Sequence, residues 1–119
     1  MRFLTALSAL CVVAGATALA EAETRHRCAD DAIAKAKPLL VLQYDIGPNP
    51  DNLAIDSRVR VLPPIRALKG KGQLDVLEVI GHIYRADYRM RFIYVQSKSD
   101  CALMGQEILE MSDPYGSAR

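Results

Sequence analysis

Two cysteines, Cys28 and Cys101, set the strongest constraint on how this chain folds, because a bond between them would enclose nearly the whole domain. Loop-closure entropy gives a bridge of this span roughly 4 kcal/mol of stabilisation, a large share of what a small domain has. The alternative is a catalytic thiol at Cys28, with His26 as the neighbouring base. Spacing alone is weak support for such a pair, so we expect a structural disulfide in an oxidising compartment.

The N-terminus indicates that the protein is exported. A positively charged start precedes an apolar run over residues 4–19, and small residues follow it, which is typical of a secretory signal peptide. The small-x-small rule places cleavage after Ala20 or Ala22, and cleavage removes the third cysteine, Cys11. A membrane-spanning anchor is the alternative, but the run is near the lower length limit for crossing a bilayer. We therefore expect a signal peptide over residues 1–20 and a periplasmic or secreted protein of a Gram-negative bacterium.

The charge balance and the missing motifs exclude several classes of function. Without residues 1–20, the chain holds 14 basic and 14 acidic residues, so bulk electrostatic binding of nucleic acid is not expected. The dinucleotide-binding fingerprint, the phosphate loop, paired CxxC motifs and HExxH are absent from the sequence. Two histidines and scattered methionines are poor material for a metal site. We expect no cofactor, no metal, no nucleic-acid partner and no stable membrane insertion after signal cleavage.

The length and the turn residues indicate a single domain over residues 28–112. A flexible leader (21–27) should precede this domain, and a loose tail (113–119) should follow it. Regularly spaced alanines predict a helix over residues 28–37, and Pro38 should end this helix.

The next part of the chain is predicted to form short strands separated by turn residues. The apolar run at residues 39–44 has the length of a strand, and a loop follows at residues 47–52. Alternating arginine and valine predict a second strand at residues 57–62, which Pro63 and Pro64 should stop. Glycines at residues 70–72 indicate another loop.

Alternating apolar and polar residues predict a β-hairpin between Gln73 and Gln96, with Ala86 and Asp87 as its two-residue turn. Since side chains alternate between faces, this turn fixes the register of both strands. The expected apolar face pairs Ile83 with Met90, Gly81 with Phe92, and Val79 with Tyr94. The expected polar face pairs Tyr84 with Arg89, His82 with Arg91, and Ile80 with Ile93.

Residues 101–110 are expected to form a further strand on the other side of this hairpin. In that register Leu103 lies beside Tyr94, and Phe92 lies between Gly81 and Gly105. A C-terminal helix is the alternative, because methionines and isoleucine recur here at helical spacing, but Gly105 counts against it. The expected fold class is α+β, with one N-terminal helix packed on an antiparallel sheet of four or five strands and one disulfide.

Charge is unevenly distributed along the chain. The net charge is −3 over residues 21–57, +6 over residues 58–98 and −3 over residues 99–119. The candidate binding residues on the polar face of the hairpin are His82, Tyr84, Arg89 and Arg91, because arginine forks suit carboxylates and phosphates. The alternative is a solvated sheet face, neutralised by acidic residues that the fold brings near.

These features favour a non-enzymatic exported binding or accessory module. Its expected partner is a protein of the cell envelope or another anionic molecule, bound at the basic sheet face. One alternative is a small hydrolase-type enzyme that uses His82 and its neighbours. The other is a protein inhibitor of an envelope or secreted hydrolase, which would need a protruding loop at residues 47–52 or 67–72.

Overall fold

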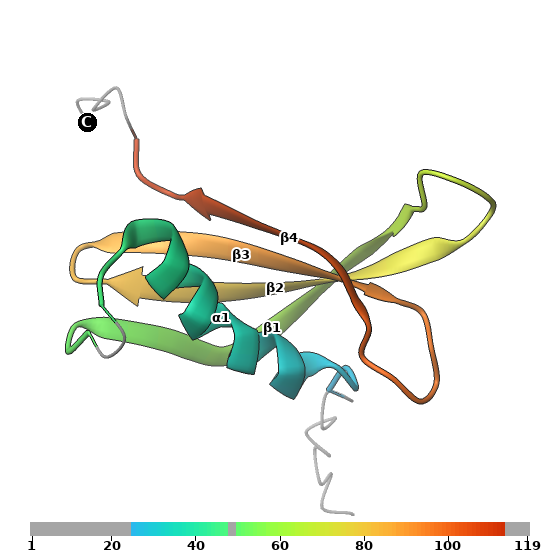
Figure 1. The fold of residues 1–119 in the computed structure, drawn as a ribbon, viewed down its shortest axis with the longest axis horizontal. Helices are drawn as coiled ribbons and strands as arrows, with labels where there is room; N and C mark the ends of the chain where they lie inside the picture. The colour runs from blue at the N-terminus through green and yellow to red at the C-terminus, as the bar shows by residue number, and fades with distance from the viewer. Residues whose placement is uncertain (1–24, 48–49, 114–119) are drawn as a thin grey trace, which may run out of the picture.

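The computed structural model describes residues 25–47 and 50–113, and one helix packs there on a four-stranded antiparallel sheet (Figure 1). The elements are α1 (Ala29–Tyr44), β1 (Leu53–Arg66), β2 (Gln73–Ile83), β3 (Ala86–Val95) and β4 (Leu103–Glu110). The strands lie in the order β1-β2-β3-β4, so β1 and β4 are the edges of the sheet. The predicted α+β class is confirmed, with a C-terminal strand and not a helix. The expected signal peptide lies outside the described residues.

Helix α1 runs through Pro38 to Tyr44, so the predicted helix end and the predicted strand at residues 39–44 are wrong. The buried residues form one stripe of the helix: Ala29, Ala32, Ala36, Leu39 and Leu40. Burying the two leucines contributes about 3 to 6 kcal/mol, whereas an interior proline costs roughly 3 kcal/mol. Tertiary packing therefore offsets the cost of Pro38, and the helix continues beyond it to Tyr44.

Strand β1 is longer than the strand predicted at residues 57–62, and Pro63 and Pro64 lie inside it. The register between β1 and β2 shifts between Leu62 and Ile65, where the two prolines are. Proline donates no backbone hydrogen bond, and it is tolerated here because β1 is an edge strand with an irregularity. The tip of the β1–β2 hairpin extends beyond the N-terminal end of α1 (Figure 1).

The turn between β2 and β3 consists of Tyr84 and Arg85, so the predicted turn at Ala86 and Asp87 is wrong. Tyr84 has a φ of 54°, and its N–H donates a 3.1 Å hydrogen bond to the carbonyl of Asn52. The change of turn moves each pairing by an even number of residues, since Met90 faces Val79 and not Ile83. An even shift keeps the side chains within β2 and β3 on their predicted faces, although Tyr84 now lies in the turn.

The core lies between α1 and the inner face of the sheet. Its largest fully buried side chains are Tyr94, Phe92, Leu40, Leu77, Met90, Val79 and Cys28. Phe92 is buried as expected, but its cross-strand neighbours are Leu77 and Gln106 and not the two glycines. The predicted pairing of Leu103 with Tyr94 is confirmed.

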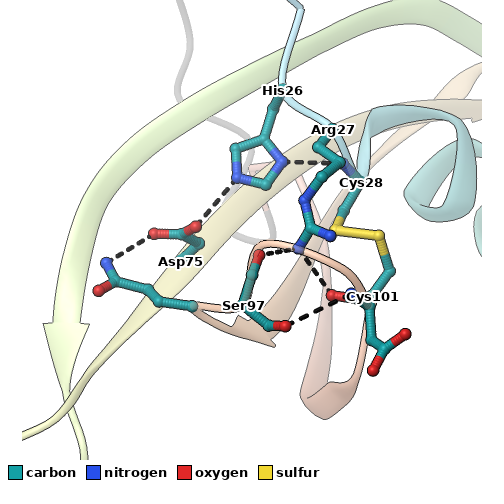
Figure 2. Close-up of polar contacts among 8 residues, drawn as sticks. His26, Arg27, Cys28, Asp75, Ser97 and Cys101 are labelled. Atoms are coloured by element: carbon teal, nitrogen blue, oxygen red, sulfur yellow. Dashed lines mark hydrogen bonds and ion pairs between the residues drawn. A yellow bond between two sulfur atoms is a disulfide. The ribbon is translucent and has the colours of Figure 1, made fainter.

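A disulfide joins Cys28 to Cys101, as predicted, with the two Cα atoms 5.6 Å apart. Cys28 immediately precedes α1, and Cys101 lies between β3 and β4. The bond therefore ties the start of the helix to the loop at one end of the sheet (Figure 2).

Candidate binding surface

The face of the sheet opposite α1, here called the outer face, carries the charged residues. Leu77 and Val79 point toward the helix, so the alternating positions of β2 and their cross-strand partners point away from it. The charged side chains at or beside the outer face are Asp56, Arg58, Arg60, Glu78, His82, Asp87, Arg89, Arg91 and Glu107. Both signs are present, and their pairing decides which of them can bind a partner.

Glu78 organises the centre of this face. It is only 7% exposed, and its Oε2 accepts a 3.1 Å hydrogen bond from Nε of Arg91. Nε of Arg89 lies 3.9 Å from the same oxygen, and Nη1 of Arg91 lies 3.6 Å from a carboxylate oxygen of Glu107. The structure thus brings the two predicted arginines together, but around carboxylates of the same chain. Neutralisation of this kind was the alternative interpretation of the basic stretch.

His82 is held between two carboxylates from neighbouring strands. Its Nδ1 lies 2.6 Å from Oδ1 of Asp87, and its Nε2 lies 2.9 Å from Oδ1 of Asp56. The hydrogen bonds to Asp87 and then to Asp56 raise the pKa of the His82 imidazole above its ordinary 6.5. A ring bonded in this way favours the protonated form, because only the imidazolium donates from both nitrogens.

Tyr84 does not share the sheet face with the other three predicted residues. It lies in the β2–β3 turn, is 74% exposed, and its ring faces the guanidinium of Arg85, 5.2 Å from the ring centroid. The four predicted binding residues therefore fall into three separate places: the Glu78 cluster, the His82 cluster and the turn.

Arg58 and Arg60 on β1 are the basic residues of the outer face that no hydrogen bond or ion pair joins to another described residue. They line an open groove of about 560 Å³ together with Asp56, Glu78 and Ile80. In the sequence these two arginines belong to the basic stretch 58–98, and their Arg-Val-Arg-Val alternation predicts a strand, but neither signal distinguishes them from the other basic residues of that stretch.

The same two arginines also line a second groove of about 560 Å³ along the free edge of β1, here called the edge groove. Its lining consists of Arg25, His26, Ser57, Arg58, Val59, Arg60 and Val61, and it contains no carboxylate. Arg25 is partly neutralised by Asp30, whose Oδ1 lies 2.9 Å from Nη1. The edge groove is therefore basic, with apolar side chains between the arginines.

The last residues before α1 are held against the sheet around the disulfide (Figure 2). Nδ1 of His26 accepts a 3.0 Å hydrogen bond from the N–H of Cys28, and its Nε2 lies 3.0 Å from Oδ2 of Asp75. The hydrogen bond from His26 is the largest of the interactions that lower the pKa of the Asp75 carboxyl. The Arg27 guanidinium donates to the carbonyls of Ser97 and Asp100. These contacts fix the wall of the edge groove that Arg25 and His26 provide.

The part of the chain that the structure describes contains neither a metal-binding cluster nor a membrane-spanning helix. Over residues 25–47 and 50–113, no three side chains of His, Cys, Asp or Glu are grouped so that they could hold a metal ion. The one helix in these ranges is too short and too polar to cross a membrane.

Comparisons with protein families, with curated proteins and with solved structures gave no match to this chain. The fold and the surface define its class: a small, disulfide-bonded α+β domain with a basic strand edge.

Proposed function

We propose that this protein is a small exported binding or accessory module, without enzymatic activity, that contacts an acidic protein partner. The observation that carries the proposal is that no hydrogen bond or ion pair joins Arg58 or Arg60 to another described residue. The other cationic groups of the outer face, Arg89, Arg91 and His82, already lie against carboxylates of the same chain. Arg58 and Arg60 are exposed and line grooves, so their guanidinium groups are available to carboxylates of another molecule.

The proposed location is the periplasm or the extracellular space. The Cys28–Cys101 disulfide supports it, because such bonds persist in oxidising compartments and are rare in the cytosol. The signal-like pattern of residues 1–20 supports the same location.

The surroundings of His82 favour a binding module over the enzyme alternative. Both ring nitrogens are already bonded to carboxylates, so a substrate would have to displace Asp56 or Asp87 before the imidazole could exchange a proton with it. His82 also lines neither of the two grooves that contain Arg58 and Arg60.

A protein inhibitor is a second candidate, and one feature favours it. The loop at residues 67–72 forms the tip of the β1–β2 hairpin, which extends beyond α1 (Figure 1). Leu68 in this loop is fully exposed, and the same loop contains Lys69 and Lys71. An exposed leucine on a protruding loop is a shape that can enter a pocket of another protein.

Capture from envelope extract tests the proposal, with the disulfide-bonded protein as bait. The double variant Arg58→Glu, Arg60→Glu should lose the captured partner. The matched variant Lys69→Glu, Lys71→Glu changes the net charge equally at the hairpin tip and should retain it. Loss with the tip variant alone would favour the inhibitor, and equal capture by all three proteins would contradict the proposed surface.

A further inference from the structure

The free edge of β1 is an open strand edge. β1 pairs with β2 on one side, and over the described residues no strand pairs with its other side. The carbonyl of Ser57, where the β1–β2 register shifts between Ile55 and Val59, accepts a 3.3 Å hydrogen bond from Nη2 of Arg25, so this backbone acceptor is bonded to a side chain and not to β2. An edge of this kind is a template on which an extended segment of another chain can add as a strand.

The charge of this edge selects the segment that could add. Residues 57–72 contain five basic residues and no acidic residue: Arg58, Arg60, Arg66, Lys69 and Lys71. Basic side chains on an edge strand repel a second basic strand and attract an acidic one. The edge groove, which has no carboxylate in its lining, places Arg58 and Arg60 directly beside the open backbone.

The alternation of β1 specifies the pattern of the added segment. Arg60 faces Glu78 across the outer face, and Arg58 lines a groove with the same glutamate, so the two arginines share that face. Val59 and Val61 pair with Val79 and Leu77, which face the helix, so both valines lie on the helix side, where Val61 is still 54% exposed. An added strand therefore meets arginine and valine in turn, with a period of two.

We propose that the edge groove binds an extended segment of the partner protein as a fifth strand, with carboxylates at alternate positions and apolar residues between them. The carboxylates would bond to Arg58 and Arg60, and the apolar side chains would cover Val59 and Val61. Pro63 and Pro64 have no N–H to donate, so the pairing ends before them. This inference rests on the proposed function and adds the site and the chemistry of the partner.

A short synthetic peptide tests strand addition directly. The probe is a blocked heptapeptide in which glutamate alternates with valine, titrated into the 15N-labelled disulfide-bonded protein and followed by NMR. Saturable amide shifts along β1 are expected. Two isomers, each N-methylated at alternate residues, provide the decisive control, because only one set of alternate N–H groups in an added strand pairs with the edge. One isomer should lose binding, and the other should keep it.

Two charge variants test the groove itself. The double variant Arg58→Glu, Arg60→Glu should weaken binding of the peptide by about tenfold or more, because it removes two charge pairs and adds repulsion. The control variant Lys69→Glu, Lys71→Glu changes the net charge of the protein by the same amount, but at positions outside the edge groove. It should leave the affinity for the peptide within about twofold of the wild type. Equal weakening by both variants would overturn the groove, because it would show a response to net charge alone.

The possible failures can be told apart. Equal binding of both N-methylated isomers would overturn strand addition and leave an acidic partner at Arg58 and Arg60 in place. Absence of binding by the unmodified peptide would overturn the inference, and capture from the envelope extract would then decide the proposed function by itself. Binding of phosphatidylglycerol vesicles through Arg58 and Arg60, without peptide binding, would identify a lipid surface and also overturn it.

Discussion

The hydroxyl of Tyr94 donates a 2.7 Å hydrogen bond to Oδ2 of Asp31, and this bond connects β3 to the first turn of α1. Tyr94 is fully buried, so its hydroxyl needs a partner inside the protein. Asp31 provides one, and Nζ of Lys35 lies 2.8 Å from both of its carboxylate oxygens. Burial and this hydrogen bond raise the pKa of the Tyr94 hydroxyl.

Tyr94→Phe should lower the free energy of unfolding by about 1 to 2 kcal/mol, because it removes a hydrogen bond to a charged acceptor and leaves the ring in place. Denaturant unfolding measures the change. Tyr84→Phe is the matched control, since the hydroxyl of this exposed turn residue can be lost without effect. An unchanged stability of Tyr94→Phe would show that the bond contributes nothing.

The Tyr94–Asp31 pair also makes the stability of the protein depend on pH. Hydrogen bonds from Lys35 and then Tyr94 lower the pKa of Asp31 below its ordinary 3.8. A group with a lowered folded pKa contributes stability above its ordinary pKa, and this stability is lost as the pH falls through the folded value. The unfolding free energy of Tyr94→Phe should therefore fall less steeply than that of the wild type as the pH is taken below 3.8.

Gly81→Ala should destabilise the protein by about 1 to 3 kcal/mol through overpacking. A Cβ atom on Gly81 would lie 2.6 Å from Cδ1 of Leu40 and 2.9 Å from Cε of Met90, and both side chains are fully buried. Gly105→Ala is the control, since its Cβ would meet Ile93 no closer than 3.6 Å. Thermal unfolding of the two variants compares them, and a larger loss at Gly105 would contradict the packing of α1 on β2.

The sequence predicted the parts of the fold that depend on periodicity. The period of two in β2 and β3 placed Phe92 inside and Arg91 outside, and the actual turn did not change this, because the register moved by an even number of residues. The disulfide followed from the two cysteines that would remain after signal cleavage.

Features that depend on tertiary contacts could not be predicted in the same way. Pro38 signals a helix end, but burial of Leu40 against the sheet carries the helix further. Tyr84 takes a positive φ in the turn without being Gly, Asn or Asp, so no turn signal marks it. The pairing of Arg91 with Glu78 depends on the true register, and the predicted register had placed Arg91 opposite His82.

Arg91→Ala should destabilise the protein by about 1 to 3 kcal/mol, although Arg91 is partly exposed. The loss arises because the Glu78 carboxylate, whose side chain is only 9% exposed, would keep only the more distant Arg89 as a partner. A double-mutant cycle with Glu78→Ala checks the cause. The double variant should lose less stability than the sum of the two single changes. Strict additivity would mean that the pair is not coupled.

His82 should titrate above its ordinary pKa of 6.5, because Asp87 and Asp56 both stabilise its protonated ring. Since its folded pKa is raised, the stability that it contributes is complete below 6.5 and is lost as the pH rises through the folded pKa. NMR titration of the His82 ring measures the pKa, which should fall in Asp87→Asn and in Asp56→Asn. Unfolding of His82→Gln, followed over the same pH range, should lack the loss of stability that the wild type shows. A wild-type His82 that titrates at or below 6.5 would contradict the two hydrogen bonds that span β1, β2 and β3.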